Sequence, residues 1–109
     1  GTPGAEIISE LKPAESEYII VKPRFSAFFC TEVGLILKRL MIDDIVICGV
    51  QYPNCIRATA LDSVSYDYST TVITDATAGS DNEIALSNIR DLRNIGVKCL
   101  TFDEWSKKI

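Results

Sequence analysis

The sequence predicts a three-layer α/β/α fold, in which helices cover both faces of a parallel β-sheet. Short β-branched runs alternate with longer segments whose apolar residues recur at helical spacing. Strands that alternate with helices of ten or more residues are joined by right-handed crossovers, and such crossovers make a sheet parallel. With 109 residues, of which 47% are hydrophobic, the chain is large enough for one core and too short for two. We therefore expect residues 1–109 to belong to one domain.

The first part of the chain predicts a short helix and a strand. Turn-forming residues occupy positions 1–4, and apolar residues between 7 and 11 then follow at helical spacing until Pro13 ends the helix. The run 18–21 is rich in β-formers and is stopped by Pro23, so it predicts a buried strand.

The next segments predict a helix, a strand and a second helix. An aromatic-rich loop leads to Thr31, which is expected to cap a helix with apolar residues between 33 and 40. Residues 44–49 form a short apolar run and predict a strand. A helix is expected from Pro53 to about Tyr66, since proline is favoured in the first helical turn. Its inner face is expected to comprise Ile56, Ala60 and Val64.

The last third of the chain continues the alternation. Residues 69–76 predict a third strand, and residues 81–96 predict a helix that Gly96 ends in the C′ position. Residues 97–102 predict a fourth strand, and a short helix over 103–108 closes the chain. After the first helix the expected order is therefore β-α-β-α-β-α-β.

Composition excludes several classes of function. The net charge of -4 argues against a nucleic acid or an anionic membrane as partner, because binding either requires basic residues that neutralise phosphates. No apolar run reaches the length of a membrane span, and no export signal is evident, so a cytoplasmic protein is expected. The four cysteines show no paired C-x-x-C spacing and are expected to be free thiols. The absence of histidine removes the commonest general base and metal ligand, so we expect no metal and no cofactor.

Candidate chemistry gathers where the predicted strands end, because ligands of parallel α/β sheets bind beyond the carboxyl ends of the strands. Cys55 allows two interpretations there. It falls near the amino end of a predicted helix, where backbone N–H groups favour a thiolate, and Lys22 leaves a neighbouring strand at the same edge. Free cysteine is nevertheless among the most buried residue types, so the physics of the sequence alone favours a structural role. The ends of the predicted strands carry Lys22, residues 49–55, Asp75, Asp103 and Glu104.

Four segments in succession carry a resemblance to a known family. "VKPRFSAFF", "VICGVQYPNCIRATALD", "VITDATA" and "RNIGVKCLTFDEW" resemble motifs of the isochorismatase-like cysteine hydrolases, which include nicotinamidases and other amidohydrolases of small molecules. The similarity covers nearly the whole chain in the same order, and its GV-x-x-x-N-C element is specific. It implies a sheet of strand order 3-2-1-4-5-6 and favours a nucleophilic role for Cys55.

The resemblance also implies roles for individual residues. In the family an Asp-Lys-Cys triad hydrolyses the substrate, and the matching positions here are Cys55 as nucleophile and Lys22 as the lysine. The peptide between Val50 and Gln51 corresponds to a cis bond of the family. The amides of Gln51 and Cys55 would then form an oxyanion hole. Phe25 is the expected member of a substrate pocket, although an aromatic cluster after a strand is more often part of a core.

Two departures from the family pattern stand out. The family's aspartate lies at the end of an earlier strand, and no such motif occurs in this sequence. Asp75 follows a later strand, where a turn or cap role is favoured. Tyr52 stands where the family often has a small hydroxyl residue that caps the helix, and a tyrosine cannot cap in that way.

The missing motif has a structural consequence. Residues 1–109 would make up a partial domain with four of the family's six strands. The two missing strands would lie in the sheet between the first and the second strand of this chain. We therefore predict that the four strands do not form one continuous sheet, and that a complementary N-terminal segment carries the triad aspartate. The metal-binding members of the family carry an Asp-x-His motif in that same region. The resemblance further implies a homo-oligomer.

Two classes of function remain open. The first is a cysteine hydrolase that cleaves an amide or related C–N bond of a small molecule through a covalent Cys55 intermediate. The second is an inactive relative that serves as a binding or structural module. A nucleotide or phosphate binder is disfavoured, because the turn after residues 44–49 lacks a glycine-rich fingerprint.

Overall fold

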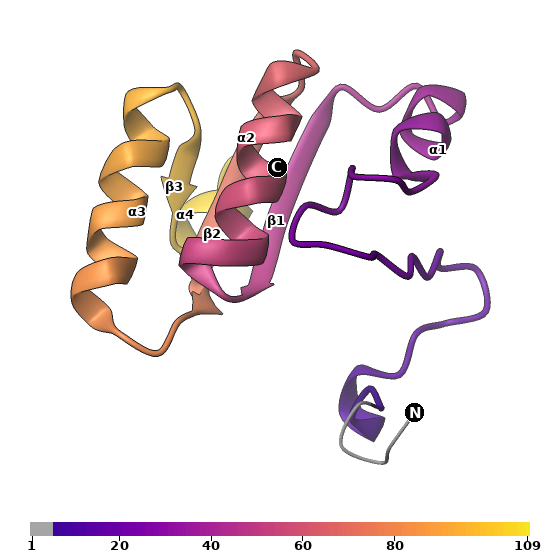
Figure 1. Cartoon of the computed structure of the whole chain (residues 1–109), viewed down its shortest axis with the longest axis horizontal. Coiled ribbons are helices and arrows are strands. Elements are labelled where there is room, and N and C mark those ends of the chain that lie inside the picture. The colour runs from indigo at the N-terminus through magenta and orange to yellow at the C-terminus, as the bar shows by residue number, and fades with distance from the viewer. Residues whose placement is uncertain (1–5) are drawn as a thin grey trace.

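A three-stranded parallel sheet forms the centre of the computed structural model, which describes residues 6–109 (Figure 1). The strands are β1 (Asp44–Val50), β2 (Ser69–Ala78) and β3 (Lys98–Leu100), and they lie in the order β1-β2-β3. The three strands occupy the places expected for the last three strands of the predicted order. The turn expected over residues 1–4 lies outside the described residues.

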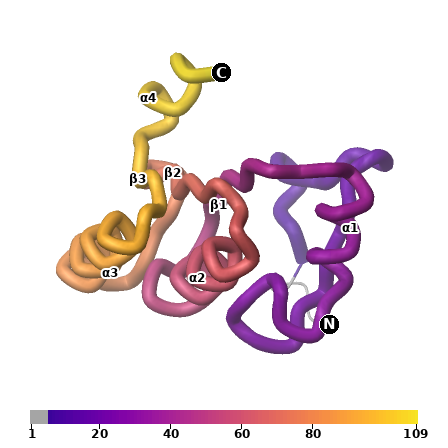
Figure 2. Tube along the Cα trace, turned by 90° about the horizontal axis from the view of Figure 1, so that it is seen from above, coloured from indigo at the N-terminus to yellow at the C-terminus, as the bar shows by residue number. Residues whose placement is uncertain are grey.

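The helices form layers on the two faces of this sheet. The elements are α1 (Val33–Arg39), α2 (Arg57–Ser65), α3 (Asn82–Asn94) and α4 (Phe102–Ser106). Figure 2 shows α2 and α3 side by side on one face, α4 on the other, and α1 beyond the β1 edge. The three-layer α/β/α class predicted from the sequence is therefore confirmed. No helix in the described part of the chain is both long and apolar enough to span a bilayer.

The hydrophobic core lies between the sheet and the pair α2 and α3. Ile47 and Val72 enter it from the sheet, and Leu92 enters it from α3 with 1% of its surface exposed. The inner face predicted for α2 is confirmed, since Ile56 and Ala60 are buried and Val64 packs against the same cluster. This core fixes the position of α2, and therefore of the turn that precedes it.

Two glycines adopt left-handed backbone conformations at the ends of elements. Gly96 has φ of +97° and follows α3, which confirms the predicted helix end. Gly49 has φ of +121° and lies in β1 where the pairing with β2 changes register. Ile47 pairs with Val72, whereas Gly49 pairs with Thr77, so β2 contains a bulge next to the end of β1.

The strand predicted over residues 18–21 is wrong. Its residues have no strand assignment, and the side chains of Ile19 and Val21 are 63% and 87% exposed. A strand requires a neighbour to pair its backbone groups, and no other segment of residues 6–109 lies alongside this one in a ladder. The segment runs apart from the sheet in Figure 1. The prediction that the four segments do not form one continuous sheet is confirmed.

Several helix boundaries also differ from the prediction. The helix expected over residues 7–11 is one 3₁₀ turn, Ser9–Leu11. The helix expected from Pro53 begins instead as a π-helical turn, Tyr52–Ile56, which continues into α2. Both segments carry a proline within or just after them, and the ring restricts regular α-helical hydrogen bonding.

Capping groups explain two further differences. The N-cap position of α1 is Glu32 rather than Thr31, but the Thr31 hydroxyl oxygen still accepts from the N–H of Val33, the first residue of α1, at 3.3 Å, and the hydroxyl donates to the carbonyl of Ala27. The fourth predicted strand ends at residue 100 rather than 102, because Thr101 and Glu104 form a capping box that starts α4.

Candidate active site

Cys55 lies in the π-helical turn between β1 and α2, at the carboxyl end of the central sheet. The carbonyl of Gln51 accepts hydrogen bonds from the backbone N–H groups of Asn54 at 3.2 Å and Ile56 at 3.1 Å. These bonds close the turn around the cysteine. The Cys55 side chain is half-buried, so its sulfur is held by the turn without being sealed in the core.

Lys22 meets Cys55 across 33 residues of sequence. Its Nζ atom donates to Cys55 Sγ at 3.0 Å and to the carbonyl of Arg24 at 3.1 Å. The ammonium is exposed, and it donates to no carboxylate within residues 6–109. This contact places a cation beside the sulfur atom, an arrangement that is typical of nucleophilic cysteines.

The loop that carries Lys22 is tied to α2. The backbone N–H of Ala27 donates to the side-chain oxygen of Thr59 in α2 at 3.0 Å. Ser26 is buried, and its hydroxyl accepts from the N–H of Phe28 at 3.1 Å. Lysine and cysteine are thus both held against the same helix.

The other predicted site residues lie around the turn in different ways. The peptide bond between Val50 and Gln51 is cis. Both residues are exposed, and they stand between the end of β1 and the turn of Cys55. Phe25 is 57% exposed and lies three residues beyond Lys22 in the chain. No hydrogen-bonded or stacked partner holds its ring within the described segment.

Tyr52 has a role in the turn that the sequence reasoning missed. Its ring is 3% exposed, and its hydroxyl donates to the carbonyl of Thr74 in β2 at 2.8 Å. Burial raises the pKa of the phenol, so the group stays a neutral donor. As expected, Tyr52 provides no helix cap. From the sequence one sees only that Tyr52 replaces a small hydroxyl residue of the family. The carbonyl that accepts its hydrogen bond is that of Thr74, and the bulge in β2 determines where this carbonyl lies.

The carboxylates and remaining cysteines lie elsewhere. Asp75 Oδ1 accepts from the N–H of Phe102 at 2.8 Å, so this carboxylate stabilises the start of α4, in line with the favoured cap role. All four cysteines are free. Cys99 is buried, which raises the pKa of its thiol, whereas Cys30 and Cys48 are exposed.

A metal centre does not fit the described residues. The chain contains no histidine, and residues 6–109 hold no group of three or more Cys, Asp or Glu side chains that could surround an ion.

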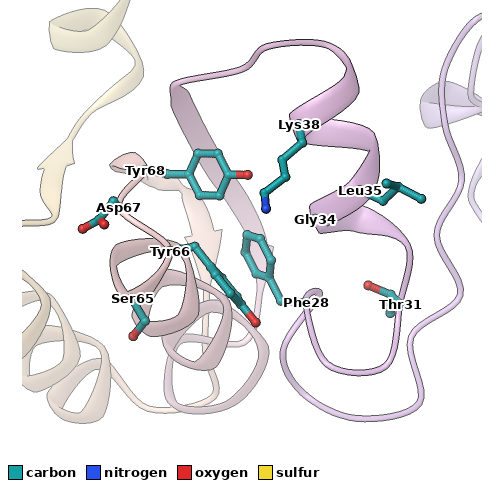
Figure 3. A pocket seen from close by; sticks show the side chains of 9 residues that line it. All are labelled: Phe28, Thr31, Gly34, Leu35, Lys38, Ser65, Tyr66, Asp67 and Tyr68. Carbon is teal, nitrogen blue, oxygen red and sulfur yellow. The ribbon is translucent and has the colours of Figure 1, made fainter.

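A cavity in the described part of the chain lies away from Cys55, at the opposite end of α2. It has a volume of about 540 Å³ and opens between α1 and the α2–β2 connection (Figure 3). The ring of Phe28 packs against Tyr66 and Tyr68, with ring centroids 5.4 and 6.1 Å apart, and Lys38 extends toward these rings. None of the predicted site residues lines this cavity.

Comparison with known proteins gives the family. Residues 1–104 match the model of the isochorismatase domain, so the chain belongs to the isochorismatase family. An Arabidopsis thaliana protein described as a probable inactive nicotinamidase is 50% identical over 111 residues, and the alignment covers 100% of this chain and 57% of that protein. The ureidoacrylate amidohydrolase of Yersinia enterocolitica is 34% identical over 87 residues, which cover 76% of this chain and 38% of that enzyme.

Solved structures agree with this assignment. An isochorismatase family protein from Desulfovibrio vulgaris superposes with a TM-score of 0.95 at 45% identity, covering 98% of this chain and 56% of that one. The pyrazinamidase of Pyrococcus horikoshii, solved in complex with zinc, gives a TM-score of 0.84 at 30% identity, covering 93% of this chain and 59% of that one. The matched residues therefore span between 38% and 59% of the length of these relatives, one of which is named an amidohydrolase.

Proposed function

We propose that this chain forms the thiol-bearing part of a cysteine hydrolase that cleaves an amide or related C–N bond in a small molecule. The observation that carries this proposal is the 3.0 Å contact between Lys22 Nζ and Cys55 Sγ. It pairs a nucleophile with a cation at the carboxyl end of a parallel sheet, where ligands of such folds bind. Family membership supports the same reaction class, since relatives of this chain are amidohydrolases.

The proposed reaction follows from the chemistry of a thiolate. The sulfur of Cys55 attacks the carbonyl carbon, and the tetrahedral intermediate places its negative oxygen near the backbone amides of Gln51 and Cys55. The C–N bond then breaks, the nitrogen leaves with a proton from a carboxylic acid, and the acyl group stays on sulfur as a thioester. Water, deprotonated by the resulting carboxylate, hydrolyses the thioester and restores the thiolate. Lys22 stabilises the sulfur anion before attack and after release.

The acid that shuttles the proton is proposed to come from a complementary N-terminal segment outside this chain. Within residues 6–109, no carboxylate is hydrogen-bonded to Cys55 or Lys22. An apolar cavity of about 390 Å³ separates residues 18–21 from β1. The relatives are longer than this chain, and side chains of the complementary segment are proposed to pack against the apolar residues that line this gap. The cavity is lined by Tyr18, Ile20, Val33, Ile36, Leu37, Leu40, Ile42, Ile45, Val46 and Asp44.

The proposal extends to assembly and location. Phe25 is proposed to line the substrate pocket, because its ring is uncovered and it follows Lys22 by three residues in the chain. A homo-oligomer would complete that pocket. The cytoplasm is the proposed compartment, since the mechanism needs reduced thiols and all four cysteines are free.

Selective alkylation tests the activated thiol. Iodoacetamide at neutral pH is expected to modify Cys55 well ahead of Cys48, which is exposed and serves as the internal control. The substitution Lys22→Met should slow Cys55 toward the rate of Cys48 without changing Cys48 itself. Peptide mass spectrometry over a time course gives both rates in one sample. Equal rates for the two cysteines in the native chain would sink the hydrolase proposal.

A second candidate is a binding module without turnover. It is favoured by one observation, the similarity to an Arabidopsis protein described as a probable inactive nicotinamidase. The two candidates differ in the fate of a small amide added to the chain together with a relative's N-terminal segment. A hydrolase releases amine and shows a transient mass increase on Cys55. A module shows saturable binding, no amine and no adduct.

A further inference from the structure

We propose that Tyr52 is a positioning residue, which fixes the turn of Cys55 against β2 and so aims the sulfur at Lys22. The inference rests on the proposed function, because it explains how the proposed nucleophile is held. It concerns a position where the family often has a small hydroxyl residue, and such a residue is too short to reach β2 from the turn.

The acceptor of the Tyr52 hydroxyl is a carbonyl that the sheet leaves free. The pairing of β2 with β1 skips from Val72 to Thr77, and its pairing with β3 ends at Ile73. Residues 74–76 therefore belong to neither register. The Thr74 carbonyl lies in this gap and accepts the Tyr52 hydroxyl at 2.8 Å. A bulge that leaves a strand carbonyl unpaired thus creates the attachment point for the turn.

The ring of Tyr52 is fixed along its length as well as at its hydroxyl. It belongs to the core cluster and is 3% exposed. Gly79, just beyond β2, is a neighbour of Tyr52, since a Cβ at residue 79 would lie at an ordinary contact distance of 3.8 Å from Tyr52 Cβ. A ring that is buried in the core and hydrogen-bonded at its hydroxyl leaves the first residue of the turn little freedom.

This restraint passes to Cys55 through the turn itself. Tyr52 is the first residue of the π-helical turn and Cys55 is the fourth, and the Gln51 carbonyl binds the backbone on both sides of Cys55. Lys22 is held independently by its loop, which is bonded to Thr59. The two partners thus reach their 3.0 Å contact only while the turn keeps its orientation.

The substitution Tyr52→Phe tests the proposal, because it keeps the ring and removes the hydrogen bond. Alkylation of Cys55 by iodoacetamide is expected to slow by roughly threefold to tenfold, the effect of one lost hydrogen bond on a positioned group. Cys48 should react at an unchanged rate. The matched control is Tyr66→Phe, which removes the hydroxyl of a ring that is 65% exposed and should change neither value.

The outcomes separate this proposal from the proposed function. A fast Cys55 in the native chain that stays equally fast in folded Tyr52→Phe overturns the positioning role and leaves the hydrolase intact. A native Cys55 no faster than Cys48 overturns both. If the Tyr52→Phe variant does not fold, amide hydrogen exchange of the native chain tests instead whether the turn of Cys55 is held rigidly. The amides of residues 54 and 56, which donate to the Gln51 carbonyl, must then be as protected as those of residues 71–73 in β2, and exchange at the rate of the exposed segment 14–17 overturns the proposal.

Discussion

At the scale of single residues, the candidate site depends on a few contacts between segments far apart in the sequence. Lys22 and Cys55 meet at 3.0 Å, and the loop of Lys22 is bonded to α2 through Thr59. Each contact is one hydrogen bond, and one hydrogen bond contributes about 1 kcal/mol to stability in general. The geometry of the site is therefore sensitive to substitutions that touch neither the lysine nor the cysteine.

The substitution Thr59→Val should show this sensitivity. It leaves the N–H of Ala27 in a partly buried place without an acceptor, which costs about 1–3 kcal/mol of unfolding free energy. The loop of Lys22 should also loosen, so alkylation of Cys55 should slow. Urea unfolding and iodoacetamide labelling measure the two effects. Thr59→Ser, which keeps the acceptor oxygen at the same position, is the control, and equal behaviour of the two variants would contradict the prediction.

At the scale of elements, short helices are held by their first turns. In α4 the Thr101 hydroxyl accepts from the N–H of Glu104, and the Glu104 carboxylate accepts from the N–H of Thr101. Asp75 adds a third bond to the N–H of Phe102. A helix of five residues has little intrinsic stability, so these bonds fix its start on the sheet.

The stability of the folded helix α4 should therefore depend on pH. The hydrogen bonds from the Thr101 backbone and side chain lower the pKa of Glu104 below its ordinary value of 4.5. A carboxyl group whose folded pKa is depressed contributes stability above its unfolded pKa, and this contribution is lost as pH falls through the folded pKa. Fluorescence of Trp105, the single tryptophan, should stay constant from neutral pH down to about 5 and change below the ordinary value. Glu104→Gln should remove most of this change, whereas Glu83→Gln in α3 should preserve it.

At the scale of the whole molecule, the β1 edge of the sheet and the part of one face that belongs to β1 are open in the described structure. Along β1, Ile45 and Ile47 point toward α2, whereas Val46 and Val50 alternate to the other face and are 42% and 63% exposed. Unpaired strand edges with apolar neighbours promote association between chains.

The 109-residue chain is accordingly expected to self-associate when it is alone in solution. Sedimentation velocity should show larger species as concentration rises, and the double substitution Val46→Lys with Val50→Lys should shift them toward monomer. Leu86→Lys, on the exposed side of α3, offers a control of similar exposure that should not alter association. The expectation would be refuted if the native chain, like the double variant, sediments as a monomer at every concentration tested.

The sequence predicted the elements that carry their own signals. The alternation of strands and helices, the inner face of α2 around Ala60 and the end of α3 at Gly96 all follow from local patterns. The strand at 18–21 was wrong, because β-propensity records side chains that suit a sheet and does not supply a pairing partner. The start of α4 was misplaced because a threonine such as Thr101 suits the end of a strand as well as the N-cap of a helix.

For the candidate site, too, the sequence predicted what depends on local motifs and missed what depends on contacts between distant segments. Cys55 and Lys22 were selected from motif positions, but the distance between them depends on how the loop of Lys22 folds back onto α2. The role of Tyr52 could not be predicted, since its acceptor exists only because the register of β2 changes 22 residues further along the chain.

The hydrogen bond between Ala27 and Thr59 attaches the loop of Lys22 to the same helix that follows Cys55. Cys55 stands just before α2, and the loop of Lys22 is fastened within the first turn of that helix. The Tyr52 hydroxyl bonds the turn of Cys55 to β2 as well, so the pair is carried by the helix and the sheet together. A shift of α2 on the sheet would strain this turn, and the alignment of the pair therefore depends on the packing between the two layers.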